Sequence, residues 1–515
     1  DDLALDFYPL DCDFAAPWEG PLPSALDGGD AWRTVGDTVE RLELLAARLI
    51  EGNTKADPAW AATRAVLERV DAQIAPGVDA SGAAELNGLL TGLDGKFVDP
   101  GPSGAPTRGR PDVLPTGRNF FSVDTRTVPT PAAWELGWKS AQLLAETHAQ
   151  THGEWPRAVA LSAWGTSNMR TGGDDIAQAM ALIGARPTWD GASRRVTGFE
   201  IMPVSVLDRP RVDVTLRVSG FFRDAFPGLI DLFDSAVAAI GAITDESPRD
   251  NPLADRIGAE AHRLEAKGVD TGEARRRASY RVFGAMPGAY GAGLQALIDE
   301  QGWDSAADLA AAYIAWGGWA YGAGTGGGKA EAYGVAAHDT FARRLGRVEA
   351  VIQNQDNREH DLLDSDDYYQ FEGGLAAAVT AQSGHEPTIY HNDHSRPFAP
   401  AIRTLEAEIA RVVRGRVTNP KWIAGVMRHR YKGAFEMAAT VDYLFAFAAT
   451  TSAVRDDQFD AVYDAFVADD RVRAFLHEHN PAALAEMAER FLEAAERGLW
   501  RARSNSAYAR LSELA

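Results

Sequence analysis

The sequence predicts an α/β protein, in which an open α/β sheet is followed by mostly helical segments in a multi-lobed chain. A short apolar run at 157–164 suits a buried strand, and a loop and an amphipathic helix follow it. Two more strand candidates lie at 198–206 and 211–219, and helical spacing returns at 221–240. Strands and helices that alternate in this way are typical of an open α/β sheet.

The chain before this region is predicted to be helical. Apolar residues recur with helical spacing at 38–49, and 61–74 also has a helical pattern. We therefore assign 1–98 to a helical N-terminal region. Five prolines among glycines then exclude a helix or a central strand, so 99–116 is predicted to be a surface connection. These prolines are Pro100, Pro102, Pro106, Pro111 and Pro115.

The α/β domain is assigned to 117–245. Within it, Asp174 is a suitable N-cap for a helix, and Gly184 suits the position just after its end. Beyond about residue 250 the strand signals disappear. We assign 246–350 to a mixed, mainly helical region with glycine-rich loops, and 351–515 to a mainly helical C-terminal region that carries the candidate site.

Composition excludes several classes of protein. The 515 residues include 51 Lys+Arg and 73 Asp+Glu, and the net charge of −22 argues against a general nucleic-acid binder. The single cysteine, Cys12, excludes an internal disulfide and a cysteine-rich metal site, and it fits a reducing compartment. No apolar run of about 18 residues could span a membrane, and the acidic start lacks a secretory pattern. We therefore expect a cytoplasmic protein. The missing initiator Met indicates processing, or excision from a longer chain.

The glycine-rich segment 322–329 resembles a nucleotide loop but departs from the required patterns. A phosphate-binding loop needs Gly at 323, where the chain has Ala, and Ser or Thr at 330, where it again has Ala. The dinucleotide pattern does fit the glycines, but the preceding 309–316 has the pattern of a helix rather than a strand. A closely packed or flexible loop is the better interpretation, and we expect no nucleotide site.

Two neighbouring windows carry groups suited to metal chemistry. The acidic window 356–372 includes Asp364, Asp367 and Glu372, with aromatic residues such as Tyr368 between the acids. A solvated acidic turn and the edge of a pocket explain this window about equally well. The segment 391–394 places His391, Asp393 and His394 close together in what its flanking prolines indicate is a loop. Imidazole and carboxylate ligands suit Co²⁺, Ni²⁺ or Zn²⁺, although surface histidine pairs are also common.

A basic segment and a loop complete the candidate set. Between 421 and 432 the chain carries four fixed positive charges and no acid, which indicates either a solvated face or a clamp for a carboxylate-bearing ligand. The candidates for the clamp are Arg428, Arg430 and Lys432. The loop 164–173 lies between a predicted strand and helix, where open α/β sheets bind ligands, and it contributes Trp164 and Arg170.

Several short motifs together resemble the large subunit of aerobic cobaltochelatases. They occur in one order along most of the chain, from about Leu114 to beyond Thr440, at 114–120, 128–130, 164–175, 209–214, 219–224 and 418–422. The large subunit of magnesium chelatases, called H, shares the outline, but Asp174-Asp175 and the segment 431–436 look more like the cobalt branch. Family members are about twice this length or more, so the chain resembles a C-terminal portion.

The resemblance implies insertion of Co²⁺, as substrate ion, into hydrogenobyrinic acid a,c-diamide. It also implies that separate AAA+ and companion subunits bind and hydrolyse ATP with Mg²⁺. Insertion requires a metal stripped of water, a bound macrocycle and removal of two pyrrole protons. We assign His391, Asp393 and His394 to the metal, with Asp364, Asp367 and Glu372 as further catalytic candidates. We assign Arg428, Arg430, Lys432, Arg170, Trp164 and Tyr368 to binding of the anionic tetrapyrrole.

Three alternatives remain open from the sequence. The chain could belong to a magnesium chelatase of the H type, which inserts Mg²⁺ into protoporphyrin IX. It could be a non-catalytic tetrapyrrole-binding module, which would bind the macrocycle without giving a metallated product. It could also be a metal-dependent hydrolase that uses the His/Asp segment, in which case the purified protein would hold metal in stoichiometric amount.

Overall fold

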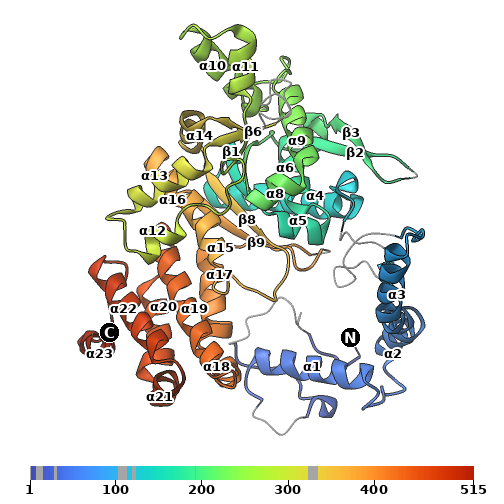
Figure 1. Ribbon diagram of the computed structural model, residues 1–515, viewed down its shortest axis with the longest axis vertical. Helices are drawn as coiled ribbons and strands as arrows, with labels where there is room; N and C mark the ends of the chain where they lie inside the picture. Colours follow the sequence, from blue (N-terminus) through green and yellow to red (C-terminus); the bar gives the residue numbers. More distant parts are fainter. Residues whose placement is uncertain are drawn as a thin grey trace. The chain divides into compact units, whose positions relative to one another are not determined.

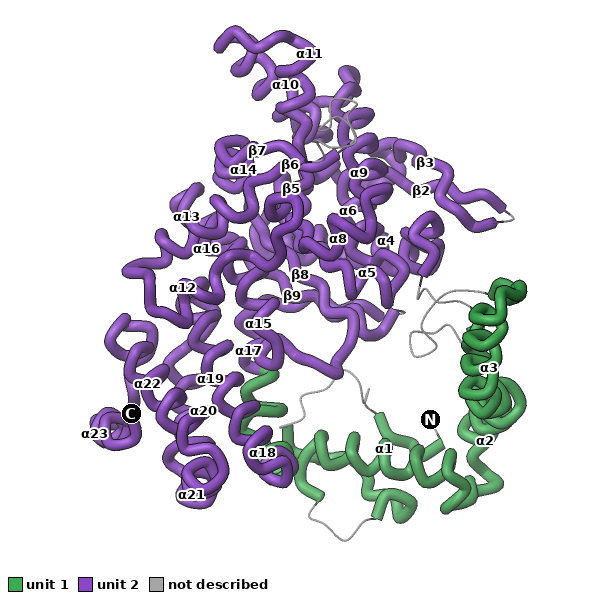
Figure 2. The backbone as a smooth tube through the Cα atoms, viewed as in Figure 1, with its two compact units in different colours: residues 1–122, 411–424 green, residues 123–410, 425–515 purple. Residues whose placement is uncertain are grey.

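The computed structural model describes residues 2–6, 16–27, 32–101, 113–118, 123–191, 193–322, 334–397 and 399–515. These residues form two compact units, coloured separately in Figure 2. Unit 1 comprises Asp1–Ser122 with Arg411–Ala424, and unit 2 comprises Val123–Ala410 with Gly425–Ala515. Apart from Gly322, the glycine-rich segment 322–329 lies outside the described residues.

The described part of unit 1 is helical, as the apolar spacing predicts. Its elements are η1 (Ser24–Leu26), α1 (Val35–Ile50), α2 (Ala61–Arg69), η2 (Val70–Ile74), α3 (Ala75–Leu93), η7 (Val413–Val417) and the first residues of α18 (Pro420–Met427). Helix α1 begins with a capping box, in which Thr34 and Asp37 each accept a hydrogen bond from the other's backbone N–H. Lys421, one of the four basic residues at 421–432, pairs with Asp37 at 2.8 Å.

Unit 2 contains a seven-stranded sheet in the order β7-β6-β5-β4-β1-β8-β9. The strands β5, β4, β1, β8 and β9 run parallel, and β6 and β7 are added antiparallel at one edge. The bounds are β1 (Ala158–Ala163), β4 (Asp213–Val218), β5 (Val282–Gly284), β6 (Trp319–Tyr321), β7 (Val335–Ala336), β8 (Ala350–Gln355) and β9 (Thr388–Asp393). A separate antiparallel pair is formed by β2 (Ala185–Trp189) and β3 (Val196–Ile201).

Helices cover both faces of the sheet (Figure 1). Those up to residue 265 are η5 (Thr125–Thr127), α4 (Pro131–His152), α5 (Gly165–Thr171), α6 (Asp174–Ile183), α7 (Val204–Leu207), α8 (Gly220–Ala225), α9 (Pro227–Ile240) and α10 (Pro252–Glu265). Those up to residue 383 are α11 (Thr271–Ala278), α12 (Gln295–Asp299), α13 (Ala306–Gly317), α14 (His338–Leu345), α15 (Asp366–Tyr368), η6 (Tyr369–Gly373) and α16 (Gly374–Ser383).

The C-terminal part of unit 2 is helical, in agreement with the sequence. Its elements are α17 (Leu405–Val412), the end of α18, α19 (Tyr431–Thr450), α20 (Asp456–Tyr463), η8 (Asp464–Ala468), α21 (Asp470–His479), α22 (Pro481–Glu496) and α23 (Asn505–Leu514). Helix α22 begins as the dipeptide Asn480-Pro481 predicts, because the Asn480 side chain accepts a hydrogen bond from the backbone N–H of Ala483.

The α/β fold class predicted from the sequence is confirmed. The strands predicted at 157–164 and 211–219 are β1 and β4, paired in parallel from Ala158↔Asp213 to Ala163↔Val218. One face of these strands packs on α6 and α9, through buried residues such as Leu161, Leu216 and Ile176. The strand predicted at 198–206 does form, as β3, but it belongs to the separate two-stranded sheet.

The predicted disappearance of strands after about residue 250 is wrong. Strands β5 to β9 all follow that point, and β8 and β9 continue the parallel sheet beyond β1. Both of these strands end in polar residues that are buried: Gln353, Asn354 and Gln355 in β8, and His391, Asn392 and Asp393 in β9. Because a buried strand is recognised in sequence by its apolar residues, these polar halves have the pattern of loops.

Helix α6 begins beside the candidate loop 164–173, and a glycine in the left-handed conformation lies at each of its ends. Gly173 is its N-cap with φ +104°, and a Cβ there would lie 2.6 Å from Val128. The cap is therefore Gly173 rather than the predicted Asp174, which is the first helical residue. Gly184 ends the helix in the left-handed conformation, as predicted. The buried Arg209 and Arg211 donate to carbonyls of its last turn, including those of Ala181 and Ile183.

Among the described residues, no helix is long and apolar enough to cross a membrane.

Candidate functional site

The carboxyl ends of the parallel strands β1, β8 and β9 bring distant segments together. Trp164 follows the last residue of β1, Asp356 follows β8, and His391 lies near the end of β9. In open α/β sheets this edge is where ligands bind, because loops and helix beginnings converge there. The sequence predicts the location only for the loop after β1, since β8 and β9 lack a clear strand pattern.

Aromatic side chains from three segments pack together at this edge. The ring centroids of Trp164 and Tyr368 are 4.8 Å apart, and those of Trp164 and Phe371 are 5.9 Å apart. The ring of Tyr368 lies 5.4 Å from the imidazole of His391. Trp164 is half-buried, whereas Tyr368 and Phe371 are buried. The structure therefore joins two of the predicted substrate-binding residues, Trp164 and Tyr368, to the predicted catalytic His391.

The buried histidine of this group is paired with a buried carboxylate. His391 Nδ1 donates to Glu372 Oε2 at 2.9 Å, and the two side chains are 1% and 0% exposed. Glu372 lies in the π-helical turn η6, and such turns are frequent at functional sites. Glu372 and His391, which the sequence places in separate windows, therefore form one unit.

Both ring nitrogens of His391 face acceptor oxygens. Gln355 Nε2 donates to the carbonyl of His360, so Gln355 Oε1 is the atom that accepts from Arg358 and from His391 Nε2 at 3.2 Å. Burial lowers the pKa of His391, but the charge and hydrogen bond of Glu372 raise it more, so the pKa lies above its ordinary value. Glu372 therefore favours the imidazolium form of His391, although burial raises the pKa of Glu372 itself above its ordinary value. In that form His391 has no lone pair for a metal.

Arg170 lies at the same edge and is held by a bidentate ion pair. Its Nε and Nη2 donate to the two carboxylate oxygens of Asp356 at 2.7 and 3.0 Å. Asp356 is buried, whereas the Arg170 side chain is 39% exposed. The pair fixes the guanidinium and leaves part of it open to solvent, an arrangement suited to contact with an anionic ligand.

The carboxylate oxygens of Asp393 accept hydrogen bonds from two arginines and from Ser395. Its Oδ1 accepts from the backbone N–H and the hydroxyl of Ser395, and its Oδ2 accepts from Arg358 and Arg403. Burial raises the pKa of Asp393, but the charge of Arg358 and these hydrogen bonds lower it far more, to well below its usual range. Asp393 is thus an ionised carboxylate whose oxygens are engaged within the protein.

His394 belongs to a different polar network. Its Nε2 lies 2.8 Å from the hydroxyl of Ser140, which also accepts from Gln178 Nε2. Asn354 Nδ2 donates to both Gln178 and Asp175, and Asn392 donates to Asn354. Burial raises the pKa of Asp175 to about 6. All of these side chains are buried between the sheet and helices α4 and α6.

The three predicted metal ligands do not share one site. Side chains alternate along a strand, so His391 and Asp393 lie on one face of β9, while Asn392 and the following His394 lie on the other. The hydrogen bonds agree, because His391 contacts Glu372 of η6 and His394 contacts Ser140 of α4. Within the described ranges, no group of three or more His, Cys, Asp or Glu residues could hold a metal ion. The expected loop at 391–394 is wrong, because 391–393 belong to the strand β9, whereas a metal role for these side chains stays a prediction.

The remaining predicted acids lie outside this buried group. Both are exposed: Asp364 lies in the turn that precedes α15, and Asp367 lies within α15, where its backbone N–H donates to the side chain of Ser365. Of the predicted catalytic acids in the window 356–372, Glu372 alone contacts His391 in the described part of the chain. Two of the aromatic residues between these acids, Tyr368 and Phe371, do belong to the aromatic group around Trp164.

The basic segment is exposed at the junction of α18 and α19. Arg428, Arg430 and Lys432 are all exposed, and Lys432 lies 3.5 Å from Glu436 one turn further along α19. Among the described residues, no hydrogen bond, ion pair or ring contact joins this segment to Trp164, Tyr368 or His391. The three charges are therefore accessible, but they do not belong to the buried group at the sheet edge.

Several polar atoms at this edge are buried without a partner within the described ranges, which the sequence does not reveal. The indole N–H of Trp164, Gln353 Oε1 and Glu372 Oε1 are buried and have no hydrogen-bond partner among the described residues. Arg217 is also fully buried, with its guanidinium 5.2 Å from the ring centroid of Phe371. Buried polar atoms are normally satisfied, so such a concentration is expected where water or a ligand binds. In the sequence, Arg217 lies within the apolar run that becomes β4, so the pattern does not single it out.

The chain is similar to known proteins over nearly its whole length. A family model described as CobN/Magnesium Chelatase matches residues 11–507. The chain is 65% identical over 506 residues to the aerobic cobaltochelatase subunit CobN of a Sinorhizobium species, covering 98% of this chain and 39% of that protein. It is 36% identical to the magnesium-chelatase H protein of Rhodobacter capsulatus, covering 81% of this chain and 33% of that protein.

A solved structure gives the same result. The catalytic subunit of cobaltochelatase from Mycobacterium tuberculosis is similar with a TM-score of 0.81 and 44% identity, over 95% of this chain and 41% of that one. The chain thus spans about two fifths of the length of these cobaltochelatase relatives. The resemblance seen in the sequence motifs is confirmed, and the chain belongs to the CobN/magnesium chelatase family.

Proposed function

We propose that this chain forms part of the large subunit of a cobaltochelatase. That enzyme inserts Co²⁺ into hydrogenobyrinic acid a,c-diamide, while separate AAA+ partner subunits hydrolyse ATP. The choice of cobalt is supported by the 65% identity to a cobaltochelatase relative, compared with 36% to a magnesium-chelatase relative. One observation carries the assignment of the site: a buried Glu372–His391 pair lies beside Trp164 and Tyr368 at the ligand-binding edge of the sheet.

The proposed chemistry is proton removal during metal insertion. Two pyrrole N–H protons leave the macrocycle as Co²⁺ binds its nitrogens, so a base is needed at the site. Glu372 Oε1 has no partner among the described residues and is the proposed acceptor of one proton, while the other passes to water. His391 acts as a positioning residue, since it holds the other carboxylate oxygen and lowers the pKa of Glu372, which burial raises above its ordinary value.

The macrocycle would be held by the aromatic and cationic groups at the same edge. The Trp164 and Tyr368 rings offer flat apolar surface, and the indole N–H of Trp164 can donate to a peripheral oxygen. The guanidinium of Arg170, fixed by Asp356, can pair with a peripheral carboxylate. Co²⁺ would arrive carrying mainly water, because no protein cluster of three ligands exists in the described part of the chain.

The test is an insertion assay with the full-length large subunit, its partners and ATP, in which absorbance reports formation of the metallated macrocycle. The parent protein should insert Co²⁺ and not Mg²⁺, and Glu372→Gln should lower the Co²⁺ rate at least about 100-fold. Glu478→Gln, an exposed change in α21, is the matched control and should keep the parent rate. Insertion of Mg²⁺ into protoporphyrin IX would favour the magnesium alternative. Macrocycle binding without a metallated product would favour a binding module.

A further inference from the structure

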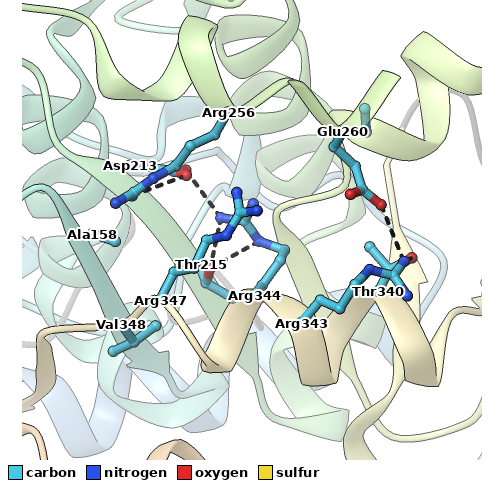
Figure 3. Close-up of a pocket in the computed structure, with 11 residues that line it drawn as sticks. Ala158, Asp213, Thr215, Arg256, Glu260, Thr340, Arg343, Arg344, Arg347 and Val348 are labelled. Carbon is cyan, nitrogen blue, oxygen red and sulfur yellow. Dashed lines mark hydrogen bonds and ion pairs between the residues drawn. The ribbon is translucent and has the colours of Figure 1, made fainter. Parts of the chain in front are cut away.

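A second charged cluster lies at the opposite edge of the sheet, where β1 and β4 begin. Asp213, the first residue of β4, is 1% exposed and accepts from three arginines that are distant in sequence, two of which, Arg256 and Arg344, are drawn in Figure 3. Arg281 Nε lies 2.6 Å and Arg344 Nη2 lies 3.0 Å from Asp213 Oδ1, and Arg256 Nη1 lies 3.5 Å from Oδ2. Three guanidinium groups thus share one buried carboxylate, and Arg256 also feels the charge of Glu349, so positive charge remains in excess.

Two further arginines extend this positive region around a cavity of about 30 Å³. Arg343 and Arg347 line the cavity together with Arg256 and Arg344, and both of them are exposed. Negative groups are fewer. Glu260 pairs with Arg263 and Arg343, and the carboxylate of Glu349 accepts from the backbone N–H of Arg157. In a protein with net charge −22, this concentration of arginine is exceptional.

Several guanidinium donors around the cavity have no acceptor among the described residues. Arg344 uses Nε and Nη2 on Thr215 and Asp213, which leaves Nη1. Arg256 uses Nη1 on Asp213 and on the carbonyl of Arg157. The Arg347 side chain makes no hydrogen bond or ion pair within the described part of the chain. The cavity is therefore lined by donors that can serve an anion.

The energetics also favour an added negative charge. Burial and repulsion from Arg281 lower the pKa of Arg344 to about 9, so its charged form is poorly stabilised by the protein alone. A purely structural ion cluster is most stable when its charges balance, and here one buried carboxylate faces three cations. A bound anion would balance the charge and would accept from the remaining donors.

We propose that this arginine pocket binds one small tetrahedral oxyanion of the phosphate class. Guanidinium groups match such an anion with paired N–H donors, which makes arginine the preferred residue for phosphate recognition. The small volume suits inorganic phosphate or a single phosphate group at the end of a larger molecule, and it excludes a tetrapyrrole. The site lies at the amino ends of the strands, so it is distinct from the Trp164–His391 group and does not depend on the proposed function.

Calorimetry with inorganic phosphate tests the pocket directly. In a HEPES buffer at fixed ionic strength, the parent chain should bind one phosphate per molecule. Arg347→Gln should weaken binding at least about tenfold, because it removes a cation that has no structural partner among the described residues. Arg501→Gln is the matched control, since Arg501 is also exposed and its side chain makes no hydrogen bond or ion pair within the described ranges. A parallel titration with ATP separates a free anion from a terminal phosphate group.

A gain-of-function variant keeps the test independent of folding defects. Glu260→Gln removes the negative charge that pairs with Arg343 and should tighten phosphate binding several-fold. The proposal is overturned if neither phosphate nor ATP binds the parent chain at millimolar concentration. It is also overturned if Arg347→Gln and Glu260→Gln leave the affinity unchanged, because the anion then binds elsewhere.

Discussion

His391 and Glu372 are joined by a hydrogen bond of 2.9 Å although 19 residues separate them in the chain. Neither side chain is accessible to solvent, so the pair is a buried unit rather than a surface contact. The second oxygen of Glu372, which has no partner among the described residues, gives this unit a site for one more proton. The roles proposed for the pair and for its neighbours lead to specific expectations.

Loss of the Glu372 carboxylate should change the protonation of His391. With Glu372→Gln the imidazole loses the charge that raises its pKa, so burial should bring the pKa below that of the parent protein. NMR with ¹⁵N-labelled histidine should report a doubly protonated His391 ring at neutral pH in the parent and a neutral ring in the variant. A neutral ring already present in the parent would contradict the ion-pair arrangement.

The two histidines of the 391–394 segment should behave differently when replaced singly. His391→Gln should reduce cobalt insertion and shift its pH profile, because Glu372 loses the group that lowers its pKa against the effect of burial. His394→Ala should instead lower the melting temperature, because it leaves Ser140 and Gln178 with an incomplete buried network. The cost of such a loss is about 1–3 kcal/mol. Equal loss of activity in both variants, with unchanged stability, would restore a joint role.

Trp164 should contribute to macrocycle affinity through its ring and its N–H. Trp164→Phe keeps an aromatic surface beside Tyr368 but removes the donor, whereas Trp164→Ala removes both. We expect the dissociation constant to rise about threefold for Phe and at least about tenfold for Ala, the scale of one aromatic contact. Absorbance titration of the tetrapyrrole measures both, and an unchanged affinity in the Ala variant would contradict the proposed platform.

The basic segment should affect mainly the rate at which the macrocycle associates, and the affinity should weaken by the same factor. Arg428 and Arg430 are exposed, so in Arg428→Gln with Arg430→Gln the association rate for the anionic macrocycle should fall severalfold and depend less on salt. Arg170→Gln removes a fixed guanidinium at the sheet edge and should mainly raise the dissociation rate. Stopped-flow measurements at two salt concentrations separate the effects. Unchanged association in the double variant would remove this segment from substrate binding.

Asp442 should make stability depend on pH below neutrality. Burial raises its pKa to about 6, despite the Arg490 guanidinium 2.9 Å away. The folded chain then binds this proton more tightly than the unfolded chain, so the free energy of unfolding falls as the pH rises from about 4 to above 6. The loss is at most about 3 kcal/mol. Asp442→Asn should flatten this part of the curve in thermal unfolding, and an unchanged slope would contradict the assignment.

The sequence by itself determined the local elements and the family. The apolar runs of β1 and β4, the glycine that ends α6 and the Asn480-Pro481 start of α22 are set by neighbouring residues, so their patterns were sufficient. The motifs identified the family because their residues and their order along the chain are read directly from the sequence, without knowledge of contacts. Trp164, Arg170, Tyr368 and Glu372 were recognised as candidates for the same reason, from their residue types and their place in the chain.

The tertiary structure decided how the candidates combine. His391 in β9 and His394, directly after the strand, point to opposite sides of the sheet, which the order of the four residues alone does not reveal. The partners of each charge come from distant segments, so Asp393 is occupied by Arg358 and Arg403, whereas one oxygen of Glu372 has no partner among the described residues. The polar ends of β8 and β9 are buried because the sheet and its helices enclose them. That enclosure is a property of the packed fold, and it places residues that look like a surface loop in the centre of the candidate site.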